Sequence, residues 1–231
     1  TPHAVVNNGS GTTPAIQVFD DHVSVEWLEI RGGSGASADL VSVNNMTAGS
    51  NRFLLRQSLL NTGTANGVNI IDADAVATLY NNMLTEVAGH GIYLSPASWA
   101  AGASIQAYNN TVAWRSNGPT RYGFQSLAAA NAPVILRNNI GDNRGIASYG
   151  LGFNVAGLSP SSSNNVSSSS DTTGPSHSPA GGGASASINY ALAPANLHLT
   201  SGSGGINQGA DLTGLMPALD IDSQLRPASA W

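Results

Sequence analysis

The chain has 231 residues, only 9% of them charged, and a formal net charge of −5 at pH 7. All eight basic residues are arginine and form no cluster, which argues against nucleic acid, because phosphate backbones are bound by stripes of cations. The same scarcity argues against an anionic membrane surface, and no apolar run approaches the ~20 residues of a membrane span. The absence of cysteine excludes disulfides and thiolate chemistry and fits an extracellular protein. We expect no cofactor.

Residues 1–21 are predicted to form an incomplete first coil of a repeat array, with "AVVNN" and "AIQVFDD" as short strands. From there a four-residue unit recurs. It reads "WLEI" at 27–30, "RQSL" at 56–59, "YNNM" at 80–83, "YNNT" at 108–111, "RNNI" at 137–140 and "SNNV" at 163–166. The steps between its copies are 29, 24, 28, 29 and 26 residues, which is typical of a solenoid.

Apolar columns flank this unit and predict a strand with one buried face. The column two residues earlier holds Leu55, Leu79, Ala107 and Leu136, and the column two residues later holds Ile30, Leu59, Met83, Thr111, Ile140 and Val166. A second strand follows in each copy, read as "LVSV" (40–43), "NGVNI" (66–70), "HGIYL" (90–94), "YGFQS" (122–126) and "YGLGF" (149–153). Because a whole coil separates successive copies, parallel stacking of coils is the arrangement that fits.

The repeated asparagines have two physical reasons in such an array. Asparagine tolerates the left-handed backbone region where a coil turns. Stacked amides can also donate to and accept from one another at the ~4.8 Å strand spacing. We predict an inward structural ladder from the first asparagine of each pair, namely Asn81, Asn109, Asn138 and Asn164.

With these repeats the chain resembles the right-handed parallel β-helix proteins of the pectin-lyase-like superfamily, over about residues 16–166. The likeness extends through "NQGADL" (207–212) and "DIDSQLRPASAW" (220–231), which are similar to the closing segment of secreted β-helix repeat proteins. The resemblance implies an all-β fold, a single-stranded right-handed parallel β-helix with an irregular C-terminal segment. Residues 1–158 are expected to form the coils, 159–187 a Ser/Gly-rich loop region with the last rung, and 188–231 a segment that packs back over the exposed edge.

Gly89-His90-Gly91 is similar to a motif of polygalacturonase-type hydrolases in this superfamily, at the start of a strand. That family also needs an Asp pair on the preceding coil and an Arg-x-Lys on the following one. The matching positions here are Ala65, Asn66, Gln125 and Leu127. Inverting hydrolysis requires two carboxylates, so the motif by itself does not predict a hydrolase.

A polar and aromatic strip accompanies the second strand, whose outward positions are expected to be Asn69, Tyr93, Gln125 and Gly152. Aromatic faces with amide neighbours are typical of sugar-binding surfaces, and the segments 95–104 and 115–121 could wall a groove. The predicted glycan-binding residues are His90, Tyr93, Arg121, Tyr122, Gln125 and Tyr149. No acidic cluster indicates a metal site.

The sequence therefore favours an extracellular, cell-surface or virion module with a structural or adhesive role that binds a polysaccharide or cell-surface glycan. Two alternatives stay open. One is a polysaccharide lyase or glycoside hydrolase with a non-standard site. The other is a purely architectural filament or spike component that self-associates, for which the sparse charge would permit close lateral packing. Neither nucleic acid nor membrane insertion is expected.

Overall fold

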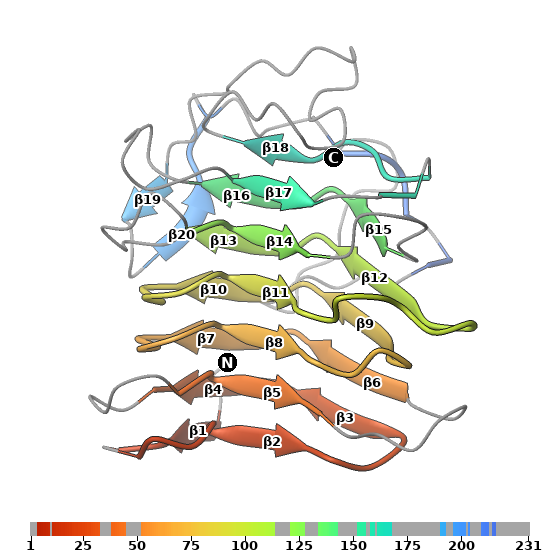
Figure 1. Ribbon diagram of the computed structural model, residues 1–231. Coiled ribbons are helices and arrows are strands. Elements are labelled where there is room, and N and C mark those ends of the chain that lie inside the picture. The colour runs from red at the N-terminus through yellow and green to blue at the C-terminus, as the bar shows by residue number, and fades with distance from the viewer. Residues whose placement is uncertain are drawn as a thin grey trace.

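The computed structural model describes residues 4–9, 11–32, 38–44, 52–113, 121–127, 134–142, 152–155, 158–159, 161–167, 190–192, 196–201, 203, 209–212 and 214–215. Over these residues the protein is a β-solenoid whose strands stack in parallel sheets, with no helix (Figure 1). The predicted all-β solenoid is confirmed. The described part of the chain accordingly holds no helix able to cross a membrane.

Each coil contributes three strands, where the sequence had predicted two. Sheet A has seven strands, sheet B six and sheet C five, all parallel. Sheet A consists of β1 (Ala4–Asn7), β4 (Leu28–Arg31), β7 (Leu59–Asn61), β10 (Met83–Thr85), β13 (Thr111–Ala113), β16 (Ile140–Asp142) and β18 (Val166–Ser167). Sheet B consists of β2 (Ile16–Val18), β5 (Val41–Val43), β8 (Val68–Ile70), β11 (Ile92–Leu94), β14 (Phe124–Ser126) and β17 (Phe153–Val155). Sheet C consists of β3 (Val23–Glu26), β6 (Arg52–Arg56), β9 (Val76–Tyr80), β12 (Ser104–Tyr108) and β15 (Val134–Arg137).

The extra strand arises because the asparagine pair interrupts what had been predicted as one continuous strand. The first member of the pair has a positive φ, 57° at Asn81 and 52° at Asn109. This left-handed residue turns the chain from sheet C into sheet A. The earlier coils make the same turn with Trp27, at 55°, and Gln57, at 50°.

The turn also resets the alternation of buried and exposed residues. Leu79 and its equivalents in sheet C are buried as predicted. Beyond the turn, however, the predicted column through Leu59 and Met83 is only partly buried. The core is lined instead by the next residue of each strand, such as Leu60 and Leu84, both 0% exposed. Ile30 pairs with Leu60 and not with Leu59, because the left-handed turn of its coil is at Trp27, the first residue of its unit, whereas in the next coil it is at Gln57, the second.

The second asparagine of each pair forms the amide ladder. Asn82, Asn110, Asn139 and Asn165 are at most 1% exposed. The Asn110 Nδ2 donates to Leu79 O at 2.9 Å and to Asn139 Oδ1 at 3.0 Å. The Asn110 Oδ1 accepts from both the backbone nitrogen, at 3.2 Å, and the Nδ2, at 2.9 Å, of Asn82. The same contacts recur at Asn82 and Asn139, and the ladder ends toward the N-terminus where Ser58 Oγ accepts from Leu28 N at 3.3 Å.

The amide-to-amide bonds described above run through Asn82, Asn110, Asn139 and Asn165, one residue after each member of the predicted ladder. Asn81, Asn109, Asn138 and Asn164 supply the left-handed turn. A ladder through these four first asparagines stays a prediction. A turn residue needs the αL conformation, and its successor faces the interior, where backbone groups must be satisfied.

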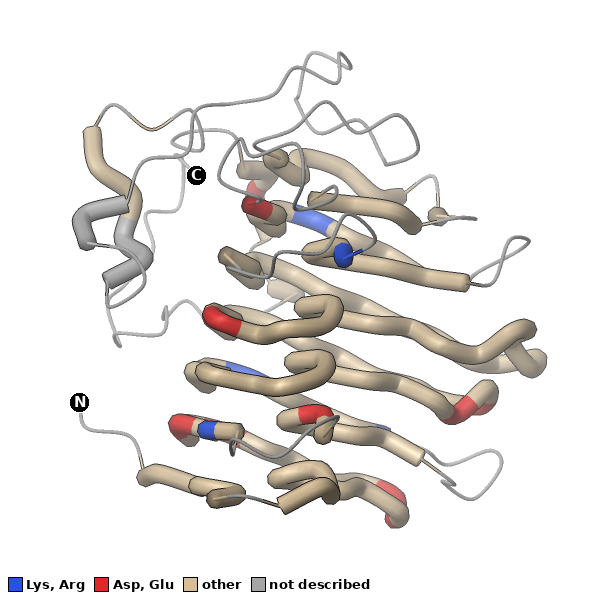
Figure 2. The backbone as a smooth tube through the Cα atoms, turned by 60° about the vertical axis from the view of Figure 1, so that its left-hand side comes forward, with Lys and Arg blue, Asp and Glu red and all other residues tan. Residues whose placement is uncertain are grey.

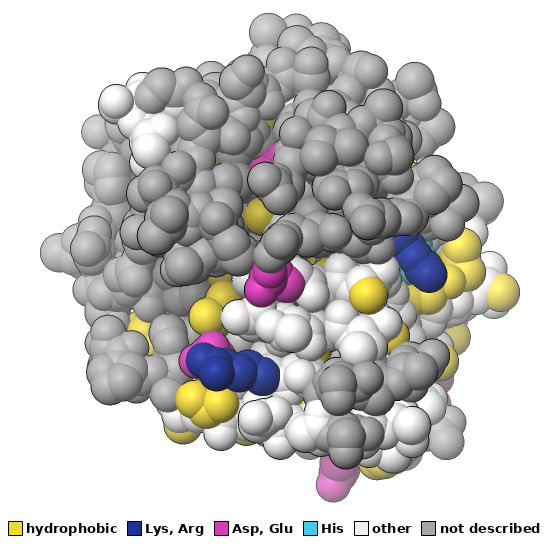
Figure 3. Space-filling model, turned by 90° about the vertical axis from the view of Figure 1, so that its left-hand side faces the viewer, with side chains coloured by type: hydrophobic (Ala, Val, Ile, Leu, Met, Phe, Trp, Pro, Cys, Tyr) yellow, Lys and Arg dark blue, Asp and Glu magenta, His cyan; other side chains and the backbone are white. Residues whose placement is uncertain are grey.

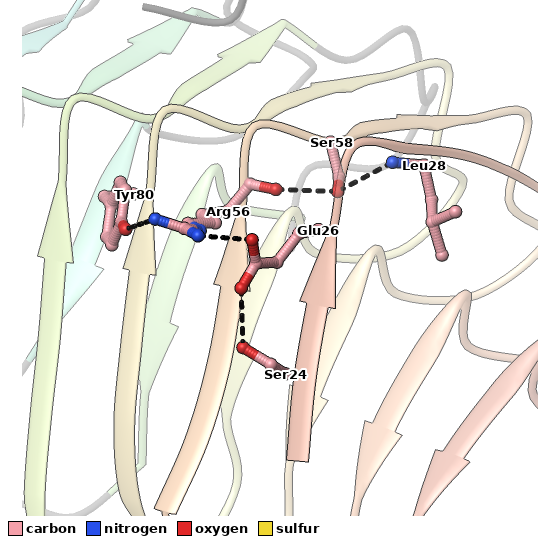
Figure 4. A network of polar contacts seen from close by, with 6 residues as sticks. All are labelled: Ser24, Glu26, Leu28, Arg56, Ser58 and Tyr80. Carbon is pink, nitrogen blue, oxygen red and sulfur yellow. Dashed lines mark hydrogen bonds and ion pairs between the residues drawn. The ribbon is translucent and has the colours of Figure 1, made fainter. Parts of the chain in front are cut away.

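A column of charged and aromatic side chains lies on the outer face of sheet C. In register along that sheet stand Glu26, Arg56, Tyr80, Tyr108 and Arg137. Figure 4 shows Arg56 between its neighbours: it forms an ion pair with Glu26 and donates to Tyr80 Oη at 2.8 Å. Because side chains of one column are only ~4.8 Å apart, opposite charges and rings satisfy each other from coil to coil.

Part of the C-terminal segment lies across this face. Leu212, 1% exposed, packs with Tyr80 and Tyr108. Asn138 Nδ2 donates to Ala210 O and Ala210 N donates to Asn138 Oδ1, both at 2.7 Å. Residues 209–212 thus pack on an outer face of the coils. The antiparallel pair β19 (Tyr190–Leu192) and β20 (Asn196–Leu199) precedes them, whereas 168–189 lie outside the described residues. The expected packing of 188–231 over the exposed edge stays a prediction, because most of that segment lies outside the described residues.

The ladder predicts that its inward amides stabilise the fold far more than an exposed asparagine does. Asn110→Ala leaves the buried Asn82 amides and Leu79 O without their partners, so the free energy of unfolding should fall by about 3 kcal/mol or more. Asn7→Ala, at an exposed asparagine whose Oδ1 accepts from Gly9 N, is the control and should cost about 1 kcal/mol or less. Urea denaturation of the two variants measures this difference, and equal losses would contradict the ladder.

Candidate functional site

In four successive coils a glycine stands where the chain bends to enter sheet B, namely Gly67, Gly91, Gly123 and Gly152. Gly91 and the following Ile92 both face the interior: Ile92 is 2% exposed, and a Cβ added at Gly91 would lie 2.3 Å from Val112 Cγ1. The same Cβ would lie 2.6 Å from Gly123 O. Gly67 is similarly crowded, since its added Cβ would be 2.7 Å from Gly91 O. The second glycine of the Gly-His-Gly motif is therefore explained by close packing of coils.

The bend brings the residues on either side of it together on the outside. The rings of His90 and Tyr93 are 4.7 Å apart between centroids, although three positions separate them in sequence. The ring of Tyr122, from the next coil, stacks parallel to His90 at 5.6 Å, with 2° between the planes. We call His90, Tyr93 and Tyr122 the aromatic group.

Hydrogen bonds that link four successive coils hold the aromatic group in place. Asp39 Oδ1 accepts from Asn66 Nδ2 at 2.8 Å, and Asn66 Oδ1 accepts from His90 N at 2.9 Å. His90 Nδ1 then accepts from Tyr122 N at 3.1 Å. Each bond fixes the donor or acceptor of the next, so the rings are positioned by backbone and amide groups rather than by packing alone.

His90 is neutral at physiological pH. Burial, and to a smaller extent the nearby charge of Arg121, lower its pKa from 6.5 to about 4. Its Nδ1 is already an acceptor for Tyr122 N, so the proton of the neutral ring is on Nε2. His90 therefore acts as an acceptor and a stacking surface.

An array of amides and hydroxyls continues beside the aromatic group. Asp39 Oδ2 accepts from Asn69 Nδ2 at 2.8 Å, and Asn69 Oδ1 accepts from Ser95 Oγ at 3.0 Å. The outward column of sheet B, in register, is Gln17, Ser42, Asn69, Tyr93, Gln125 and Asn154. The prediction that Gly152 belongs to this column was wrong. The last coil is shifted by two residues relative to the predicted alignment, so Asn154 takes this position and Gly152 belongs to the glycine column.

The predicted site residues thus fall into three classes. The ring of His90 lies against those of both Tyr93 and Tyr122, and Gln125 pairs with Tyr93 in the sheet. Arg121 is exposed beside them. Tyr149 and most of 115–121 lie outside the described residues, and Trp99 of the other predicted wall packs against the core. The sequence analysis missed Asp39. This residue occupies in its coil the position that Asn66 and His90 occupy in theirs, but the predicted column began only at Asn66.

Charge is sparse around the site and elsewhere. Figure 2 shows the described acidic and basic residues scattered along the coils, and the face in Figure 3 carries few charged side chains among its described residues. No group of His, Asp or Glu among the described residues could hold a metal ion. Recognition here would depend on rings, amides and hydroxyls.

No protein-family model, no curated protein and no solved structure matches the chain. The solenoid architecture is therefore assigned from the stacked parallel sheets of the structure alone.

The glycine column predicts that Gly91→Ala is destabilising, by about 1–3 kcal/mol, because the new methyl group overpacks the coil interior. Thermal or urea unfolding measures the loss. Val112→Ala removes one of the two groups that the methyl would meet, so the double variant should lose less than the sum of the single variants. Strict additivity would contradict the packing explanation.

Protonation of His90 should weaken the fold. Because its pKa in the folded state is about 4 and its ordinary value is 6.5, the unfolded chain binds the proton more tightly. Stability is then full above pH 6.5, declines as the pH falls toward 4, and levels off below. After allowance for solvent screening the decline should be about 1–2 kcal/mol.

His90→Gln should lack this component between pH 6.5 and 5, a window in which few carboxylates titrate. Val5→Ala, at an exposed valine, serves as the control and should retain the wild-type profile. Identical pH profiles for all three proteins would show that His90 is not buried as a neutral ring.

Proposed function

We propose that the protein is a carbohydrate-binding β-solenoid module that acts in adhesion outside the cell, at a cell surface or on a virion. We further propose that it is a member of the pectin-lyase-like superfamily, on the strength of its repeats and closing segment. The observation that carries the binding function is the aromatic group beside the amide column of sheet B.

The chemistry of this surface suits a sugar ring. Pyranoses present apolar C–H faces, which pack on aromatic rings, and hydroxyl edges, which exchange hydrogen bonds with amides. Tyr93 is partly exposed, with Asn69 and Gln125 on the neighbouring strands. Gln125 is itself partly exposed, so its side chain can meet a ligand that packs on the Tyr93 ring.

Rigidity further supports binding. The relay from Asp39 through Asn66 to His90 holds the rings before any ligand arrives. A preformed surface loses little side-chain entropy on association, which favours affinity. The backbone that carries Tyr93 is also held before binding, because β11 is paired with β8 on one side and with β14 on the other.

Binding is better supported than hydrolysis. In the described structure the coil preceding His90 presents Asn66 where the hydrolase motif requires a carboxylate, and this amide is engaged with Asp39 and His90. His90 itself has a low pKa, about 4, and an occupied Nδ1, so it is a weak base at neutral pH. An inverting hydrolase needs a second free carboxylate.

The proposal predicts that Tyr93→Ala weakens binding of the best ligand found on a glycan array. Loss of one ring should cost about 0.5–1.5 kcal/mol, several-fold to tenfold in Kd by calorimetry. Affinity should change little between low and moderate salt, because the contacts are uncharged.

Two matched variants control this experiment. Tyr93→Phe keeps the ring and should retain most of the affinity. Val5→Ala, at a valine 54% exposed on sheet A, should bind as the wild type does. Absence of any array ligand, or an equal loss in Val5→Ala, would refute the proposed function.

A further inference from the structure

Apolar side chains are not randomly placed on the outer face of sheet B. Five large hydrophobic residues are exposed in the described structure, and three of them occupy one column: Phe19 at 53%, Ile71 at 39% and Leu127 at 51%. Each directly follows a strand of sheet B. Backbone hydrogen bonds continue the parallel register through this position, from Asn44 N to Val18 O, Ile71 N to Val43 O, Ser95 N to Ile70 O and Leu127 N to Leu94 O.

Within this column, apolar and polar residues alternate from coil to coil. Its order is Phe19, Asn44, Ile71, Ser95 and Leu127. Ser95 lies on the same face as Asn69, since its Oγ donates to Asn69 Oδ1. An exposed apolar side chain therefore recurs at every second coil, about 10 Å apart, beside the column that contains Tyr93.

The charges of this face are few and do not call for an ionic ligand. Asp39 accepts three hydrogen bonds, from Asn66 N, Asn66 Nδ2 and Asn69 Nδ2. Arg121 is the one basic residue that the described structure places beside the aromatic group, and it is exposed. The remaining outward groups are amides, hydroxyls, rings and aliphatic chains.

We infer that the ligand is an extended, uncharged, linear β-linked polysaccharide that lies along the solenoid axis over sheet B. This inference rests on the proposed function. In a β-1,4-linked chain with two-fold symmetry every second sugar presents the same face, so such a polymer meets Phe19, Ile71 and Leu127 in phase. The neighbouring amides of Gln17, Asn69 and Gln125 face its hydroxyl edges.

The length of the contact follows from the sheet. From β2 to β14 the surface spans four strand spacings, about 19 Å, which is longer than a disaccharide. Affinity should therefore rise with chain length. We would titrate the protein with β-1,4-linked gluco-, xylo- and manno-oligosaccharides, from disaccharide to hexasaccharide, and with oligogalacturonides as the acidic counterpart.

In at least one neutral series, Kd is expected to fall stepwise with length. The double variant Ile71→Asn/Leu127→Asn should bind the hexasaccharide about tenfold more weakly, because it loses two apolar contacts that the ligand would cover. Its affinity for the disaccharide should be unchanged. Both sites are exposed, so folding should be little affected. Val5→Asn is the control for an exposed apolar residue on another sheet and should have no effect.

The outcomes separate this inference from the proposed function. A ligand that depends on Tyr93 but binds independently of length, or an acidic series that binds more tightly than every neutral one, would overturn the inference alone. An array without any Tyr93-dependent ligand would overturn the proposed function, and the inference with it.

Discussion

The inward amide at the turn between sheets C and A is the interaction on which the solenoid depends. A parallel coil must turn without leaving buried N–H and C=O groups unpaired. At this corner, backbone-to-backbone hydrogen bonds alone do not pair all of these groups. The amide of Asn110 supplies what is missing, by donating to a carbonyl of the coil before it and accepting from the Asn82 backbone nitrogen. Each coil thus depends on the side chain of the next, which makes the stack cooperative in one dimension.

The outer surface follows from this repeat. Once the coils are locked in register, any residue type recurring at one position becomes a column at the strand spacing. One column of sheet C holds an ion pair and two tyrosines on neighbouring strands, which pack with Leu212. Sheet B uses its columns for rings, amides and alternating apolar groups, and the glycine bend at Gly91 makes two of those columns converge. The proposed binding surface is a consequence of register rather than of a dedicated loop.

The sequence was informative about everything that repeats. The spacing of the asparagine pairs predicted the coils, and the apolar column through Leu79 predicted the sheet C core. It did not assign roles within a pair, because either Asn81 or Asn82 can be the turn residue until the backbone dihedral angle is known. A strand predicted to run on through the pair also placed Leu59 in the core instead of Leu60, because the residues on one face of a strand recur with a period of two.

The site was predictable only in part. His90, Tyr93 and Tyr122 could be grouped because they flank the glycine column. Asp39 could not be placed with them by motif, because in its coil Leu40 stands at the glycine position. Nor could the neutrality of His90 be read from sequence, because it depends on burial and on the Tyr122 backbone nitrogen that occupies Nδ1.

Amide hydrogen exchange on the native protein tests the central role of the ladder most directly. The backbone amides of Ser58, Asn82, Asn110 and Asn139 each donate to a ladder side chain. They should exchange only through global unfolding, with protection equal to that of the core strands. If they exchanged as fast as the amide of Gly9, which lies in an exposed turn, the ladder would not hold the coils together.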